Sequence, residues 1–379
     1  MFRLSYLIFL AVLIPGVLAA QSNADTTSVP SAPPQAELPS ALRGLKIGTK
    51  TYISYQYIEV DDGTEDAADI SRFQLKRGYI DIRKTITDYF SFRITPDVHQ
   101  DGTGDWKVRL KYLHARFTAP GNDVIGKPYA EVGIAHMPWL DFEEHINLFR
   151  MQGTMFMERN KLFNSADLGV MVGANIGSEL PAEFRNNVNS SYAGRWGSFQ
   201  LGVFNGGGYH ALALNRSMVF EGRLTIRPLP DVAPGFQISG FGLTGKGNTP
   251  EEPDWNALTG MVSYESVYFN ATGQYYNGAG LQNGLAIDSS GISHDQDGYS
   301  AFAELRMPGH RQYSAFGRYD RFNRDRPDEP SYHTKRFILG LAWQFIKGNY
   351  WVVSYDRVDN SLPDVPTVYN LEVTLQMVY

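Results

Sequence analysis

The strongest constraint in this sequence is a two-residue alternation of apolar and polar side chains that recurs along most of the chain. In the C-terminal stretch "NLEVTLQMVY" (370–379), every second residue is apolar, up to an aromatic last residue. Successive side chains of a strand point to opposite faces, so this pattern predicts a strand with one apolar and one polar face. The segments "FILGLAWQF" (337–345), "MVFEGRLTIRP" (218–228) and "DYFSFRIT" (88–95) alternate in the same way. A soluble β-sandwich shows the same alternation, so the number of segments and the lengths of their connections are needed to choose the fold class.

The segments and their connections favour a membrane barrel. Most segments are about ten residues long, the length that a tilted strand needs to cross a bilayer. The sequence predicts sixteen strands, at residues 45–59, 71–86, 88–98, 106–118, 129–137, 167–176, 192–205, 217–228, 235–247, 257–265, 267–277, 298–307, 311–323, 333–345, 349–358 and 369–379. Short turns such as 347–348 interleave with long polar connections such as 278–297, as periplasmic turns and external loops do in outer-membrane barrels. The connection 177–191 departs from this pattern, because it takes the place of a turn and is too long for one.

We therefore predict an all-β fold, a transmembrane antiparallel β-barrel of sixteen strands. In hydrocarbon every backbone N–H and C=O needs a partner, so a sheet can span a membrane only by closing on itself. The last strand is expected to pair with the first. Glu372, Thr374 and Gln376 would then face water inside, with Tyr379 in an aromatic girdle at the membrane interface. A soluble all-β protein with an amphipathic last strand is the alternative interpretation.

The N-terminal region carries the signals of an exported protein. Residues 1–20 combine Arg3, a short apolar run and small residues at 19–20, which predicts a secretory signal peptide. The apolar run is too short for the alternative, a membrane anchor. Residues 21–40 are rich in Pro, Ser and Ala and predict a flexible periplasmic leader, which leaves residues 41–379 for the barrel. The chain has no cysteine, which excludes disulfides and thiolate metal sites, and we expect no cofactor.

One side of the predicted lumen is basic, although the chain has a formal net charge of -6. Along residues 71–118, the positions that alternate with apolar ones are largely Lys and Arg, and Asp81 is the clear carboxylate among them. A slip in the alternation at 77–79 indicates a β-bulge, and a second slip near Leu113 turns Arg116 inward. The side chains predicted to line an anion path are Lys76, Arg77, Arg83, Arg93, Lys107, Arg109, Lys111, Arg116, Arg223 and Arg227.

Basic side chains around a narrow pore favour anions, because charged donors replace the water that an ion loses on entry. The alternative is a weakly selective pore in which opposite charges on facing walls neutralise one another.

The connection 138–166 is far longer than a hairpin turn, and its aromatic and methionine side chains are too apolar for a solvated loop. Folding back into the lumen would bury these side chains and form a constriction. The charged residues expected there are Asp141, Glu143, Glu144, Arg150, Glu158 and Arg159. The alternative is a surface lid that packs on its own apolar face.

Five segments follow one another along the chain as landmarks. They are "RFQLKRGYIDIRKTITDYFSFRITPDV" (72–98), "VGIAHMPW" (132–139), "FMERN" (156–160), "DLGVMVG" (167–173) and "SFQLGVFNGGG" (198–208). In order and spacing they resemble the phosphate-selective porins O and P, over most of 45–379. The resemblance implies a sixteen-stranded porin, a homotrimer, with an anion path lined by Lys and Arg.

Carried over by this resemblance, Lys76 and Arg77 match the basic pair of the family's first hairpin. Glu158 and Arg159 match the pair that follows its constriction loop. The family commonly has lysines where Ile134 and His136 stand, so this chain lacks two of the family's fixed positive charges.

We therefore predict a passive outer-membrane porin of a Gram-negative bacterium that admits small hydrophilic solutes and prefers anions, with phosphate as a candidate solute. Its expected partners are outer-membrane lipid, small anions and further copies of the chain in a homotrimer, and no nucleic acid is expected. A non-conducting barrel that binds a partner through its loops is the main alternative, and its lumen would be plugged by 138–166. An outer-membrane hydrolase would need a serine or an acid beside a base, and no local pattern provides one.

Overall fold

The computed structural model describes residues 39, 42–63, 69–101 and 103–379. The predicted signal peptide, 1–20, lies outside these residues, as does the predicted leader, 21–40, apart from Pro39.

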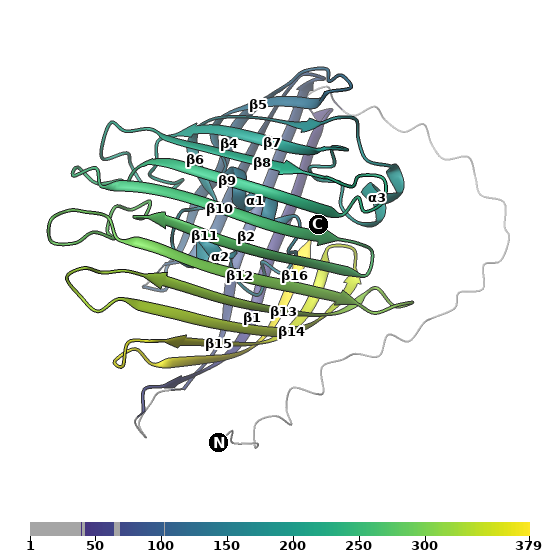
Figure 1. The fold of residues 1–379 in the computed structure, drawn as a ribbon. Coiled ribbons are helices and arrows are strands. Elements are labelled where there is room, and N and C mark those ends of the chain that lie inside the picture. Colours follow the sequence, from purple (N-terminus) through teal and green to yellow (C-terminus); the bar gives the residue numbers. More distant parts are fainter. Residues whose placement is uncertain (1–38, 40–41, 64–68, 102) are drawn as a thin grey trace. The chain divides into compact units, whose positions relative to one another are not determined.

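Sixteen antiparallel strands follow one another around a closed barrel in the order of the chain (Figure 1). The first eight are β1 (Leu45–Asp61), β2 (Ile70–Thr87), β3 (Phe90–Gln100), β4 (Trp106–Thr118), β5 (Ile125–His136), β6 (Ala166–Ile176), β7 (Gly197–Phe204) and β8 (Val219–Ile226). The others are β9 (Phe236–Lys246), β10 (Asp254–Glu265), β11 (Phe269–Ala279), β12 (Asp295–Arg306), β13 (Tyr313–Arg324), β14 (Tyr332–Ile346), β15 (Asn349–Asn360) and β16 (Thr367–Val378). The predicted fold class is confirmed, and each strand overlaps the segment predicted from its alternation.

The sheet closes where β16 pairs with β1. Lys50 lies opposite Val378 at one end of this pair, and Asp61 lies opposite Thr367 at the other. The second edge of β16 pairs with β15, so the barrel has no open edge. Closure lets the strands satisfy their backbone groups within the sheet, which is the condition for crossing hydrocarbon.

The strands bury one set of alternate side chains inside the barrel and expose the other set on the outside. In β14, Leu339 and Leu341 are 48% and 66% exposed, whereas Ile338 is 1% exposed. A soluble protein would not expose rows of leucine around its sheet, so this outer face is suited to lipid.

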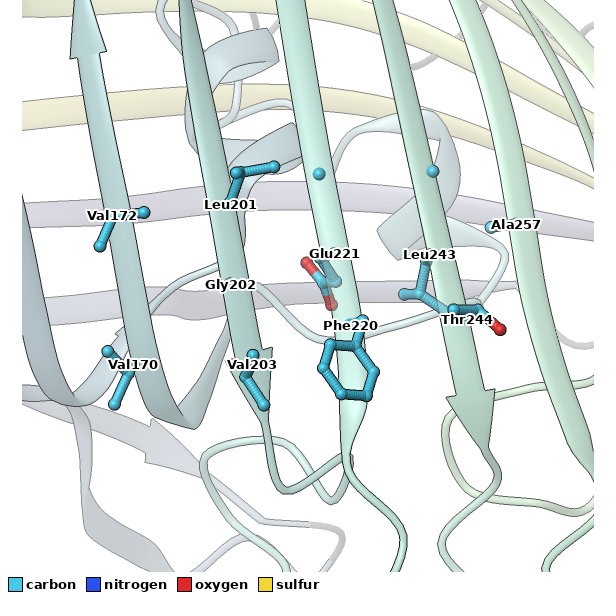
Figure 2. A pocket seen from close by; sticks show the side chains of 12 residues that line it. Val170, Val172, Leu201, Gly202, Val203, Phe220, Glu221, Leu243, Thr244 and Ala257 are labelled. Carbon is cyan, nitrogen blue, oxygen red and sulfur yellow. The ribbon is translucent and has the colours of Figure 1, made fainter.

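An apolar groove of about 630 Å³ lies on the sheet beside β6 to β10. Figure 2 shows the valine, leucine and phenylalanine side chains that neighbouring strands contribute to it, among them Val172, Leu201 and Phe220. Leu201 and Phe220 are themselves exposed. The groove is therefore part of the apolar outer surface.

Short helices occupy two of the connections. Helices α1 (Pro138–Glu144) and α2 (Phe156–Arg159) lie between β5 and β6, and α3 (Ala182–Asn187) lies between β6 and β7. Helix α3 accounts for the unexpected length of the connection 177–191. Within the described part of the chain, no helix is long and apolar enough to cross a membrane.

The substitution Leu339→Arg tests the assignment of the outer face. Leu339 lies in the middle of β14, and an Arg at the bilayer midplane costs about 2–4 kcal/mol in a membrane barrel. We expect the free energy of unfolding in lipid vesicles to fall by that amount, measured by urea titration with tryptophan fluorescence. Val365→Arg, in the exposed connection before β16, is the control and should change it by less than about 0.5 kcal/mol. An equal loss in both variants would contradict the assignment.

Candidate functional site

The connection between β5 and β6 forms an inner loop, residues 137–165, that is closed at its neck by a backbone hydrogen bond. The N–H of Met137 donates to the carbonyl oxygen of Ser165 at 3.1 Å. Pro138 then occupies the first turn of α1, where its fixed φ suits a helix and its missing N–H would have had no partner in the helix.

The inner loop is tied to one side of the barrel by buried polar contacts. Glu143 accepts a hydrogen bond from Gln274 Nε2 of β11 at 2.7 Å. Arg159 forms an ion pair with Asp320 of β13 at 3.0 Å. These partners belong to the inward-facing set of their strands, so the loop lies against the inside of the wall.

The same loop also contacts strands further around the sheet, β15 and β2. Gln152 donates to Asp356 of β15 at 3.2 Å, and its backbone oxygen accepts from Lys76 Nζ of β2 at 2.7 Å. Lys76 also pairs with Glu372 of β16 at 2.7 Å. The inner loop therefore contacts strands far apart around the barrel and narrows the lumen between them.

The apolar side chains of the loop pack on inward-facing apolar residues of the sheet. The ring of Phe149 stacks on that of Phe316, with centroids 4.0 Å apart and planes 13° apart. Trp139 lies against Phe241, with centroids 5.6 Å apart. This packing explains why a connection rich in aromatics and methionine enters the lumen instead of the external solvent.

Three charged residues of the inner loop form a buried cluster. Arg150 donates to Glu144 at 2.5 Å, and to the two carboxylate oxygens of Glu158 at 2.5 Å and 3.0 Å. Burial opposes ionisation of Glu158, but the Arg150 guanidinium outweighs it and holds the pKa of this carboxyl below its ordinary value. These ion pairs stiffen the loop where it faces the basic wall. We use this name for the inward-facing Lys and Arg side chains of β2, β3 and β4.

β-Bulges aim several cations of that wall inward. In the pairing of β2 with β1, Arg77 lies opposite Tyr52 and Leu75 opposite Ile53, which leaves Lys76 as the extra residue. Lys76 and Arg77 consequently line the same internal cavity, although they are neighbours in a strand. The bulge lies close to the slip that the sequence predicts at 77–79.

A second bulge lies in β4. Tyr112 pairs with Thr95 and Leu110 with Pro96, so Lys111 is the extra residue. Lys111 and Tyr112 are both buried in the lumen. In the sequence, Tyr112 continues the apolar alternation of Trp106, Val108 and Leu110, which predicts that it lies on the lipid face. That placement is wrong, because the bulge falls before it and not near Leu113.

Most cations of the basic wall have a carboxylate partner. Burying a charge is costly unless it is paired, which favours such contacts in a narrow lumen. The pairs are Arg83 with Asp81 (2.6 Å), Arg93 with Asp81 (2.6 Å), Arg109 with Asp97 (3.1 Å), Arg116 with Glu131 (2.7 Å) and Lys107 with Asp101 (3.3 Å).

Arg77 and Lys111 differ from these, since no carboxylate of the described residues lies within ion-pair distance of either. Lys111 instead donates to the Tyr79 hydroxyl at 3.3 Å and lies over the rings of Tyr79 and Tyr112, 4.7 Å and 5.4 Å from their centroids. Ring faces stabilise an ammonium without neutralising its charge. Two positive charges therefore stay uncompensated at this wall.

A cavity of about 160 Å³ lies where the inner loop faces the first bulge. Its cations come from two elements, Lys76 and Arg77 from β2 and Arg150 from the loop. Tyr52, Gln74, Gly153 and Thr154 complete its lining. The site thus offers guanidinium and ammonium donors around a space large enough for a small ion.

Two of the predicted lining residues lie elsewhere. Arg223 and Arg227 are each 1% exposed. Arg223 donates to the backbone oxygen of Pro138 at 3.2 Å and lies 4.3 Å from the ring centroid of Phe142, beneath α1. Arg227 donates to the backbone oxygen of Pro234. The prediction that they line an anion path is wrong, because the inner loop and the periplasmic turns cover them.

The sequence analysis also missed two carboxylates that lie among the cations of the basic wall. Asp97 of β3 is 0% exposed and pairs with Arg109, and Glu131 of β5 pairs with Arg116. Asp97 could have been found from the alternation of β3, since it shares the parity of Arg93.

The long turn 177–196 supports the inner loop from the periplasmic side. The Tyr192 hydroxyl donates to Asp141 of α1, and Asn189 Nδ2 donates to the backbone oxygen of His145 at 3.0 Å. His136 and His145 lie 3.8 Å and 3.5 Å from the Asp141 carboxylate. Burial opposes ionisation of Asp141, but the two histidines and Tyr192 hold its pKa well below the ordinary range. The sequence did not predict that the turn 177–196 contacts the inner loop, because nothing local in the turn indicates this partner.

No metal centre is found in the described ranges, where no cluster of three or more His, Cys, Asp or Glu side chains is arranged to hold an ion.

Comparison with known proteins gives structural matches only. No family model matches the chain, and no curated protein matches it. An anion-selective porin from Comamonas acidovorans is similar with a TM-score of 0.61 and 9% identity, over 88% of this chain and 99% of that one. OmpF of Salmonella typhi, in complex with daunomycin, is similar with a TM-score of 0.58 and 10% identity, over 88% and 97% of the two chains. OmpT of Vibrio cholerae in its trimer form is similar with a TM-score of 0.56 and 9% identity, over 88% and 100%.

At these identities the comparisons establish the fold. A closed sheet of sixteen strands with an apolar exterior is the architecture of Gram-negative outer-membrane proteins, and the chain is an outer-membrane barrel.

The buried carboxyl of Glu143 predicts a pH dependence of loop docking. Burial raises the pKa of Glu143 to about 7, although Arg318 and the hydrogen bond from Gln274 act in the opposite direction. Between its ordinary value and about 7, the docked loop binds a proton that the undocked loop does not. Docking is therefore strongest below this window and weakens as the pH rises through it.

The variant Glu143→Gln should remove this dependence, because the neutral amide can still accept the hydrogen bond of Gln274. The readout is maleimide labelling of a single cysteine at Leu140, which is 0% exposed in a chain without cysteine. Labelling of the parent, relative to the Glu143→Gln variant at the same pH, should be equal at pH ~4, below the ordinary value of the carboxyl, and faster above pH ~7. Glu183→Gln, exposed on α3, is the control and should label like the parent at every pH. A parent-to-variant ratio that stays constant would contradict the prediction.

Proposed function

We propose that this protein is a passive diffusion channel of the outer membrane that prefers small anions. The observation that carries the proposal is the pair of cations without carboxylate partners, Arg77 and Lys111, beside a constricted part of the lumen. Each of the other cations of the wall named above has a carboxylate partner, although Arg83 and Arg93 share Asp81, so the wall keeps a net positive charge to which Arg77 and Lys111 contribute most.

A single uncompensated charge is enough to bias the ions that enter. In water, a unit charge about 5 Å from an ion contributes roughly 0.8 kcal/mol, which is about a fourfold change in local concentration. Two such charges on the same wall favour anions over cations of equal size. The paired residues contribute a transverse field between the basic wall and the Glu144–Arg150–Glu158 cluster, which orients solutes without selecting their sign.

Phosphate is the solute class that we infer within the anions. A guanidinium and an ammonium together match the oxygens of a phosphate better than they match chloride, since the guanidinium can donate two parallel hydrogen bonds. Arg77 supplies the guanidinium at the cavity beside the inner loop, and Lys76, which is paired with Glu372, supplies the ammonium. The resemblance to the phosphate-selective porins supports the same solute, and the absence of lysine at Ile134 and His136 implies weaker binding than in that family.

The proposal includes a homotrimer. It rests on the family resemblance and on the trimer form of the structurally similar OmpT.

The selectivity test is the reversal potential of single channels across a KCl gradient in planar bilayers, at low salt to limit screening. We expect chloride to be preferred, and Arg77→Gln and Lys111→Gln each to lower the chloride-to-potassium permeability ratio roughly sixteenfold, because each charge raises the local concentration of chloride and lowers that of potassium by about the same factor. Lys347→Gln, in the periplasmic turn between β14 and β15, is a matched control and should leave the ratio unchanged. Cation preference in the parent protein would overturn the proposal.

A non-conducting barrel is the second candidate function, favoured by the burial of Lys111, Tyr112 and Arg150 at the constriction. If these contacts seal the lumen, the protein will not conduct, and its loops would carry the function. Liposome swelling separates the two candidates. A channel should admit small sugars, and Phe149→Ala, which removes the stack on Phe316, should speed their entry. Swelling no faster than in protein-free liposomes would establish the non-conducting barrel.

A further inference from the structure

The outer surface of β13, β14 and β15 carries cations near the ends of the strands that lead into the external connections. Odd-numbered residues of these strands face outward, as the exposed Leu339 shows. Arg321, Lys335 and Arg357 belong to this outward set. They lie toward the connections 325–331 and 361–366, away from the short turn at 347–348.

Two of these cations face each other across adjacent strands. Arg321 of β13 lies directly opposite Lys335 of β14. Directly opposed residues have Cα atoms only about 5 Å apart, and like charges in such a pair destabilise the sheet. An arrangement of this kind on a lipid-facing surface is favourable when an anion lies between the two side chains.

Two acids flank this pair, and neither forms an ion pair with it. Arg321 Nε donates to the amide oxygen of Asn323 at 3.2 Å, and that residue's amide nitrogen donates to Asp297 at 2.8 Å. On the β15 side of the pair, Asp359 lies opposite Lys335 in the register. Asp359 forms its ion pair with Arg357, at 2.8 Å.

Among the described residues, no carboxylate lies within ion-pair distance of Arg321 or Lys335. Lys246, an outward-facing cation near the corresponding end of β9, differs because it pairs with Asp254 at 2.7 Å.

Aromatic side chains place the pair at the level of lipid headgroups. Tyr299 lies opposite Arg321, and its ring is 6.0 Å from that of Tyr319. Phe337 lies opposite Tyr319 and next to Lys335 on the same face. Rings of this kind gather at the boundary between hydrocarbon and headgroups. A second set, Tyr313 stacked on Trp343 at 6.3 Å, marks the other boundary near the periplasmic turns.

We propose that Arg321 and Lys335 bind the phosphate group of a phosphorylated lipid in the outer leaflet. The guanidinium can donate two parallel hydrogen bonds to a phosphate, and the ammonium adds a second positive charge to the same group. The rings of Tyr299, Tyr319 and Phe337 lie along the acyl chains of that lipid. The site belongs to the outer wall and does not depend on whether the lumen conducts.

The test compares the binding of three probes to the purified protein in detergent. They are a diphosphorylated lipid A, the same lipid with its phosphates removed, and inorganic phosphate. We expect native mass spectrometry to show retention of the phosphorylated lipid. In Arg321→Gln/Lys335→Gln, its affinity should fall about thirtyfold, the effect of removing two surface charges near an anionic headgroup.

The matched control is Arg311→Gln/Lys347→Gln, which removes one Arg and one Lys from the periplasmic turns of the same sector. This variant should bind the phosphorylated lipid like the parent. Equal losses in the two double variants, or equal binding of the dephosphorylated lipid, would overturn the proposal. Binding of inorganic phosphate as tight as that of the phosphorylated lipid would also overturn it, since the occupant would then be a free anion. Closure of the barrel in each variant is checked by resistance to unfolding in sodium dodecyl sulfate at room temperature.

Discussion

The structure depends on the need of every backbone N–H and C=O for a partner in hydrocarbon. A sheet of sixteen strands meets that need only when β16 pairs with β1, and the register from Lys50–Val378 to Asp61–Thr367 provides this closure. Closure in turn divides the side chains of each strand into an outer set and an inner set. The outer set is apolar and dissolves in lipid. The inner set lines the lumen, packs against the inner loop and carries the charges of the wall.

The inner loop converts this lumen into a site. It is held by apolar packing, such as Phe149 on Phe316, and by ion pairs such as Arg159 with Asp320. Because these contacts reach strands on several sides, the loop has a defined position across the barrel. The turn 177–196 supports it from the periplasmic side through Tyr192 and Asp141. A long periplasmic turn, which looks anomalous in a simple barrel, thus has a structural role in positioning the constriction.

The electrostatics of the wall differ from a simple count of its cations. Asp81, Asp97 and Glu131 neutralise most of the arginines that the alternation directs inward. Arg77 and Lys111 lie at or beside the two bulges and have no such partner among the described residues. The proposed selectivity therefore depends on a few residues at irregular points of the sheet. The same reasoning applies on the outside, where the paired Lys246 differs from the unpaired Arg321 and Lys335.

The alternation by itself determined the number of strands, their approximate limits, the closed barrel and the lipid-facing side of most strands, because side-chain direction in a strand has a period of two residues. It also indicated that the connection 138–166 was too apolar for solvent. It could not decide what depends on contacts between distant strands. The placement of Tyr112 failed because a bulge shifts the period by one residue. The placement of Arg223 and Arg227 failed because the inner loop and turns cover them, which no local pattern reveals. Pairing of cations with carboxylates was equally invisible, since the partners lie on neighbouring strands whose register only the folded barrel determines.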